Sequence, residues 1–79
     1  MRKIKVKPYW RVISGSCLNY GCASWSLKPS HMRGEWLLHV IFEDHYSADL
    51  FIKRWIKQCG SILLNRNNGK YLVRVPVEK

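Results

Sequence analysis

The clearest periodic pattern in the chain lies between Ser47 and Cys59. Apolar residues recur there at the i, i+3, i+4, i+7 spacing that gathers side chains on one side of an α-helix: Ala48, Phe51, Ile52, Trp55, Ile56 and Cys59. Asp44 or Ser47 can cap the N-terminus of this segment, and Gly60 is a residue type at which helices commonly end. The pattern therefore predicts an amphipathic helix over residues 47–59.

The segment that follows has the pattern of a β-hairpin. Asn68 and Gly69 separate two apolar runs, and a type I′ turn needs the positive φ that these two residue types adopt most readily. The pairs that this turn predicts share the core face: Arg66 with Tyr71, Leu64 with Val73, and Ile62 with Val75. The opposite face is mixed and basic, with Leu63, Asn65, Lys70, Leu72 and Arg74. Pro76 marks a sheet edge or the end of pairing.

Two segments before the helix are predicted to be strands. Residues 36–42 are apolar on both alternating faces except at His39, which is typical of a central strand. At the N-terminus, Ile4, Val6, Trp10 and Val12 alternate with Lys3, Lys5, Lys7, Tyr9 and Arg11. This alternation predicts a strand with a basic outer face, and Pro8 and the lysines favour a place at the sheet edge.

The elements combine into an α+β fold. Residues 18–21 have turn chemistry, and the alternation of residues 23–27 predicts a short strand. We therefore expect an antiparallel sheet of four to five strands, formed by a β-meander, one helix and a C-terminal hairpin, with the helix packed on one face. The chain has no internal repeat or linker, so residues 1–79 are predicted to form a single domain.

Charge changes this picture most. Fourteen Lys and Arg against five Asp and Glu give a net charge of +9, which predicts an anionic partner, with nucleic acid as the leading candidate. Solubility alone is the other explanation of such a charge. No apolar stretch is long enough to span a bilayer, the basic N-terminus lacks the apolar region of a signal peptide, and the odd count of three Cys suits a reducing compartment. A cytoplasmic location without membrane contact is expected.

The candidate binding residues are basic side chains interleaved with aromatic ones. They are Lys3, Lys5, Lys7 and Arg11 on the first strand, Lys53, Arg54 and Lys57 on the helix, Arg66, Lys70 and Arg74 on the hairpin, and the aromatic residues Tyr9 and Tyr71. Tyr20 and Trp25 are open between stacking and core packing. Phosphate contacts and base stacking of this kind are typical of single-stranded nucleic-acid binding. The strand and hairpin sets are expected on the uncovered face of the sheet, and the helix set is expected to point away from it.

Catalytic and metal sites are not indicated. The possible metal ligands Cys17, Cys22, Cys59, His31, His39 and His45 lack the usual spacing of a zinc site. Cys17 and Cys22 are expected to be cross-strand neighbours without a metal, and Cys59 is expected in the core. The acidic cluster at Glu43-Asp44 is explained by helix capping. We therefore predict a binding protein rather than an enzyme, with no cofactor.

Three alternatives remain. One is a metal-dependent nuclease, for which the polar cluster Glu43-Asp44-His45 offers two carboxylates. Another is a small inhibitor or regulator of phage type, which binds an acidic surface of a host protein through its basic face. The third comes from residues 51–57 and the Asn67–Tyr71 turn, which resemble the helix and wing of small phage excisionases and other winged-helix proteins. That resemblance implies DNA binding, but it needs a further helix upstream, where residues 36–42 are predicted to form a strand.

Overall fold

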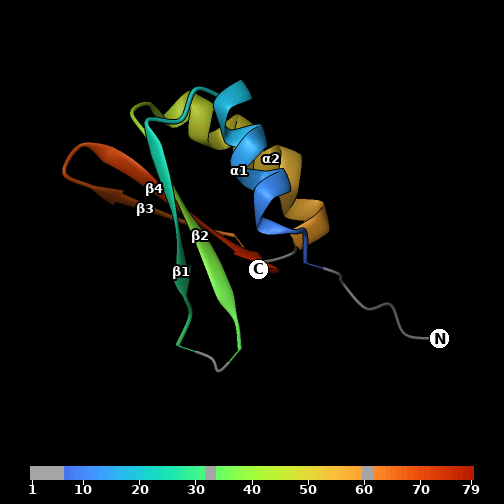
Figure 1. Cartoon of the computed structure of the whole chain (residues 1–79). Coiled ribbons are helices and arrows are strands. Elements are labelled where there is room, and N and C mark those ends of the chain that lie inside the picture. The colour runs from blue at the N-terminus through green and yellow to red at the C-terminus, as the bar shows by residue number, and fades with distance from the viewer. Residues whose placement is uncertain (1–6, 32–33, 60–61) are drawn as a thin grey trace.

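A computed structural model describes residues 7–31, 34–59 and 62–79. The elements follow in the order α1 (Trp10–Asn19), β1 (Ser24–Pro29), β2 (Trp36–Phe42), α2 (His45–Cys59), β3 (Leu63–Asn67) and β4 (Lys70–Val77). The strands form one antiparallel sheet in the order β1-β2-β4-β3, and both helices lie on the same side of it (Figure 1). The predicted α+β class, with a helix on one face of an antiparallel sheet, is confirmed.

The core lies between the sheet and the two helices. Successive side chains of a strand point to opposite faces, so every second residue of the central strands is buried. The buried apolar residues are Leu38, Val40 and Phe42 of β2, Val73, Val75 and Val77 of β4, Ile13 and Cys17 of α1, and Ala48, Phe51, Trp55 and Cys59 of α2. The prediction that residues 36–42 form a central strand is confirmed, because β2 pairs with both β1 and β4.

Helix α2 begins where Asp44 caps it. The backbone N–H of Ser47 donates to Oδ1 of Asp44 at 2.9 Å, and the Ser47 hydroxyl donates to Oδ2 at 2.9 Å. The ring of Phe51 then meets Phe42 with a centroid separation of 5.3 Å, which fixes the helix against the sheet. The predicted helix is confirmed, whereas its expected end at Gly60 lies outside the described residues.

The C-terminal hairpin has the predicted turn and register. Asn68 and Gly69 have φ values of 53° and 77°, as a type I′ turn requires. Arg66 lies opposite Tyr71, and the ladder ends at Leu63, one residue short of the expected pair at Ile62. Beyond Arg74, strand β4 continues to Val77 and pairs with β2 alone. Pro76, which has no backbone N–H, therefore lies where β4 has no hydrogen bonds to make with β3.

The predicted N-terminal strand is wrong from Trp10 onward, because residues 10–19 form helix α1, whereas the part of that prediction at residues 3–6 lies outside the described residues. Ile13, Ser14 and Cys17 are buried and Trp10 packs against the core, which is the i, i+3, i+4, i+7 stripe of a helix. Tyr9, the residue before α1, makes no side-chain hydrogen bond that caps the helix. The first N–H of the helix, that of Trp10, instead donates at 2.7 Å to the carbonyl of Glu78, just beyond β4.

The expected turn near residue 20 is the C-terminal end of α1. Gly21, with φ 75°, occupies the left-handed position of a Schellman motif. The N–H of Cys22 donates to the carbonyl of Cys17, and that of Gly21 donates to Leu18, both at 3.3 Å. The short strand expected at residues 23–27 follows directly as β1, so α1 replaces the first strand of the predicted meander.

The winged-helix arrangement is absent from the described residues. It needs a helix directly before α2, and β2 occupies that place. Neither described helix has the length and apolar character that a membrane span requires.

Candidate functional site

The face of the sheet opposite α1 and α2, hereafter the open face, is covered by no described element (Figure 1). The alternation of the strands places on it Ser24, Ser26 and Lys28 of β1, Leu37, His39 and Ile41 of β2, Lys70, Leu72, Arg74 and Pro76 of β4, and Leu63 and Asn65 of β3. Most of these side chains are exposed or half-buried, and none is fully buried. The open face is therefore a surface on which a ligand can lie.

The open face carries positive charge without carboxylates. Lys28, Lys70 and Arg74 lie on it, whereas none of the four described strands contains Asp or Glu. The acidic residues stand outside the strands: Glu35 and Glu43 flank β2, Glu78 follows β4, and Asp44 and Asp49 cap or belong to α2. A polyanion that lies along the strands of the open face consequently meets cations and neutral side chains, whereas the carboxylate of Glu35 lies at the margin, paired with Lys7.

Arg74 and His39 lie at the centre of the open face. His39 of β2 is directly opposite Arg74 of β4 and Ser26 of β1. Nη2 of Arg74 donates to Oδ1 of Asn65 on β3, which holds the guanidinium over the sheet. Nε of Arg74 is buried and has no hydrogen-bond partner among the described residues. Arg74 therefore has an N–H donor that an external acceptor can reach only when the guanidinium moves.

The pKa of His39 depends on its burial and on the charges around it. Partial burial lowers its pKa below the ordinary value of 6.5, because an imidazolium loses hydration there. The positive charges of Lys28 and Arg74 lower the pKa further. His39 is consequently neutral at pH 7, between two cations.

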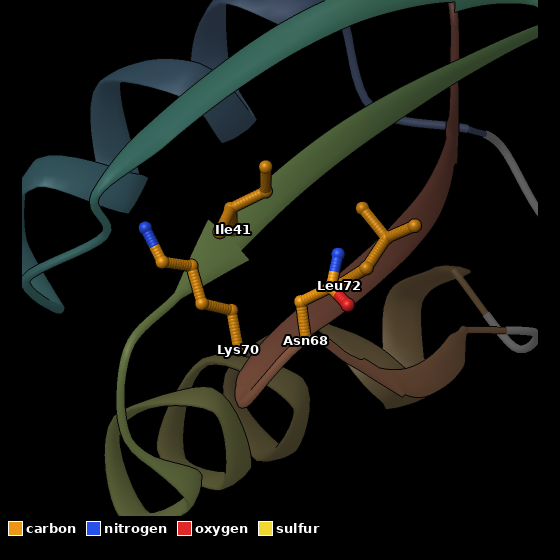
Figure 2. A pocket seen from close by; sticks show the side chains of 4 residues that line it. All are labelled: Ile41, Asn68, Lys70 and Leu72. Atoms are coloured by element: carbon orange, nitrogen blue, oxygen red, sulfur yellow. The ribbon is translucent and has the colours of Figure 1, made fainter.

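Two hollows indent the open face. One, of about 320 Å³, is lined by Ile41 of β2, Lys70 and Leu72 of β4 and Asn68 of the hairpin turn (Figure 2). The other, of about 480 Å³, lies toward the opposite ends of these strands. Its lining comprises Lys7, Ser30, His31, Glu35, Leu37, Cys59, Leu63, Arg74 and Pro76. The first hollow combines apolar walls with Lys70, which suits a ligand that is both anionic and partly apolar. The second hollow also contains the carboxylate of Glu35, which is paired with Lys7.

The predicted binding residues are only partly brought together. Lys70 and Arg74 share the open face, as expected. Lys7 reaches its margin, where Nζ pairs with Oε1 of Glu35 at 2.8 Å. Lys3 and Lys5 lie outside the described residues. The expectation that Arg66 shares the uncovered face with Lys70 and Arg74 is wrong, because Arg66 pairs with Tyr71 and lies on the helix side of the sheet.

The other predicted cations lie on the helices. The expectation that Arg11 shares the open face is wrong, because it belongs to α1, where its guanidinium lies 5.3 Å from the ring centroid of Trp10. On α2, Lys53 pairs with Asp49 at 3.2 Å and Arg54 stacks 4.2 Å from the ring of Trp55. With the exposed Lys57, these α2 residues form a second basic surface on the other side of the molecule, as the sequence predicts.

None of the candidate stacking residues occupies an open-face position of a described strand. Tyr71 belongs to the helix side of β4 and meets His45 at a centroid separation of 5.4 Å. Tyr20 packs edge-on against Phe51 and is explained by core packing, whereas Trp25 packs against Trp10 and keeps 39% of its surface exposed. Tyr9 lies beside Trp10 with 47% of its surface exposed. No open-face position of the described strands is Phe, Tyr or Trp.

Sequence reasoning missed Lys28 and His39, which lie near Arg74 on the open face. Lys28 lies just beyond the short strand predicted at residues 23–27, and no register was available to place its side chain. His39 did stand out, as the polar exception in an apolar strand, and this is the signal by which it could have been found.

Cys17 and Cys22 are neighbours, but they meet across the end of α1 rather than across two strands. Burial, reinforced by the nearby Cys22, raises the pKa of Cys17 to about 12, so this thiol is not a nucleophile at neutral pH. Cys59 is buried, as expected. No group of three or more His, Cys, Asp or Glu within the described ranges could hold a metal ion.

Comparison of the chain with protein-family models, curated proteins and solved structures gives no match. What the chain itself offers is a positively charged sheet surface with no carboxylate on its described strands.

Proposed function

We propose that this protein binds nucleic acid on the open face of its sheet and has no catalytic activity. The supporting observation is that Lys28, Lys70 and Arg74 lie on one face of a sheet whose strands contain no acidic residue. Cations so placed neutralise phosphates and release condensed counterions, which supplies sequence-independent affinity. The same three cations would add little affinity for a neutral ligand, because it carries no charge for them to neutralise. The proposed site of action is the cytoplasm.

The composition of the open face favours a double-stranded ligand. Single-stranded ligands are usually held by stacking on aromatic rings, and the open-face strand positions carry none. Ser24, Ser26 and Asn65 instead provide short hydrogen-bonding groups suited to base edges and sugar-phosphate oxygens. In this proposal phosphate contacts and these polar contacts hold the ligand, in place of the base stacking on Tyr9 and Tyr71 that the sequence suggests.

Binding is tested by fluorescence anisotropy with labelled double-stranded and single-stranded DNA and RNA. Below about 50 mM salt we expect clear binding, with duplexes preferred, and a log-linear loss of affinity as salt rises. If each of the three cations neutralises one phosphate, the slope for duplex DNA is about −3. Negligible affinity for all four ligands would contradict the proposal.

Matched triple variants locate the surface. Replacing Lys28, Lys70 and Arg74 with Ala removes three charges from the open face, and replacing Lys53, Arg54 and Lys57 removes the same number from α2. We expect the first variant to bind more weakly and with a salt slope smaller by about 3, and the second to lose much less. An equal loss from both variants, or a larger loss from the α2 variant, would contradict binding on the open face.

A second candidate function is binding to an acidic surface of another protein, as an inhibitor or regulator. The observation that favours it is the apolar content between the cations of the open face: Leu37, Ile41, Leu63, Leu72 and Pro76. Of these, Leu63 is 55% exposed. A pull-down from nuclease-treated lysate separates the two functions. A stoichiometric protein partner that the open-face triple variant fails to capture supports this candidate, and loss of all partners supports nucleic-acid binding.

A further inference from the structure

We propose that Lys28, His39 and Arg74 form a phosphate-binding subsite that takes up a proton on His39 when it is occupied. This inference rests on the proposed function, because it assigns one backbone phosphate of the nucleic acid to the centre of the open face.

The strand register brings the three side chains together. Arg74 lies directly opposite His39 on one side, and Ser26 lies opposite it on the other. Lys28 stands two residues beyond Ser26 on β1 and therefore shares the open face as a diagonal neighbour of His39. Directly opposite side chains in antiparallel strands are separated by about 5 Å, and diagonal ones by about 7–8 Å. A phosphate seated over His39 is therefore flanked by Lys28 on the β1 side and by Arg74 on the β4 side, and Arg74 reaches it by turning its guanidinium away from Asn65.

Arg74 supplies a donor to this subsite. One of its amino groups is engaged by Asn65 of β3, on the side of β4 away from β2. Its Nε is buried without a hydrogen-bond partner in the described structure, and an unpaired buried donor is costly. When the guanidinium turns toward a phosphate over His39, this donor becomes accessible and makes a charge-assisted hydrogen bond.

The charges around His39 determine the direction of the coupling. Burial, then Lys28, then Arg74 lower the pKa of His39 in the free protein. Lys70 lies further along β4 on the same face. The ion pair of Lys7 with Glu35 lies with the exposed His31 at the margin, and α1 and α2 cover the other face. His39 is thus neutral until an anion offsets its two cationic neighbours.

A bound phosphate reverses the electrostatic effect on His39, because its negative charge offsets the two cationic neighbours. A negative charge beside the imidazole favours the protonated form, so the pKa of His39 is higher in the complex than in the free protein. Linkage then requires affinity to rise as the pH falls from above the bound pKa to below the free pKa. Each unit by which the pKa rises strengthens binding about tenfold over that window. We expect binding about three- to tenfold tighter near pH 5.5 than near pH 7.5.

The test is an NMR titration of the His39 imidazole in the full chain, alone, with a duplex oligonucleotide, and with sodium sulfate. Sulfate is a phosphate-like dianion that does not titrate in this range, so it probes the subsite without nucleic acid. We expect both ligands to raise the pKa of His39. Removing a cationic neighbour in Lys28→Met should raise the pKa of His39 in the free protein toward 6.5.

Affinity measurements with matched variants complete the test. His39→Gln should bind the duplex with little dependence on pH, whereas His45→Gln, on the helix side beside Tyr71, should keep the full dependence. Circular dichroism confirms that each variant is folded. A duplex that binds without raising the pKa of His39 overturns the subsite and leaves the proposed function intact. A rise with sulfate in a protein that binds no nucleic acid supports the subsite and overturns the proposed function. No rise with either ligand overturns the subsite.

Discussion

Asp44 illustrates how a single side chain fixes an element of this fold. Its carboxylate accepts hydrogen bonds from the backbone N–H and the hydroxyl of Ser47 at the start of α2. These bonds, the backbone one first, lower the pKa of Asp44 below its ordinary value of 3.8, because they favour the ionised form. The sequence suggests either Asp44 or Ser47 as the N-cap of α2, and residue preferences at this position do not choose between them.

We expect Asp44→Ala to lower the melting temperature at neutral pH, because it removes the acceptor for the orphan N–H of Ser47. The stabilisation from the ionised carboxylate is complete above pH 3.8 and is lost as the pH falls through the lowered folded pKa. Asp44→Asn keeps a capping oxygen and should melt close to the wild type at pH 7, with a smaller loss in acid. Circular dichroism melts across the acid range measure this. Identical acid profiles for the wild type and Asp44→Asn would contradict the role of Asp44.

Phe51 is the residue on which the core depends most visibly. It is fully buried and meets both Phe42 and Tyr20. We expect Phe51→Ala to reduce the free energy of unfolding by about 3–5 kcal/mol, because it removes a buried ring and leaves a cavity. Leu50→Ala, at an adjacent position that is 39% exposed, should change it by less than about 1 kcal/mol. Urea denaturation measures both, and equal losses would contradict this assignment of the core.

At the scale of elements, α2 and the hairpin could be predicted because local and tertiary preferences agree in them. The helix has six apolar residues on one stripe, and the hairpin has Asn68-Gly69 between alternating runs. In α1, by contrast, one position of the buried stripe is Ser14 and Gly15 interrupts the middle. Its N-terminus is capped by the backbone of Glu78, far away in sequence, so no local signal marks its start.

Two glycines test this account of the elements. Neither has another atom within 4 Å of the position of an added Cβ, so only the backbone conformation separates them. Gly69 has φ 77° in the hairpin turn, and Gly69→Ala should cost about 1–2 kcal/mol. Gly15 lies within α1, and Gly15→Ala should stabilise the protein by about 1 kcal/mol, because Ala favours the helix. Chemical denaturation measures both changes. A destabilising Gly15→Ala would indicate that residues 10–19 are not helical.

At the scale of the whole molecule, the fold sorts the excess positive charge into separate surfaces. Lys70 and Arg74 could be placed together from the sequence because the hairpin turn fixes their register. Lys28 and His39 could not, since pairing between β1 and β2 depends on tertiary contacts that no short motif specifies. The expected contribution of Arg11 failed for the same reason as the N-terminal strand, because α1 carries it to the helix side.

The proposal that nucleic acid lies on the open face is tested most directly by methyl NMR. Ile41, Leu37 and Leu72 carry methyl groups on that face, whereas Val12 and Leu50 carry exposed methyl groups on α1 and α2. The protein is titrated with a duplex oligonucleotide at about 50 mM salt, where phosphate contacts are strong. We predict large shift changes for the three open-face methyl groups and small ones for the two helix methyl groups. The largest changes at Val12 or Leu50, with the open-face signals unmoved, would contradict the proposal.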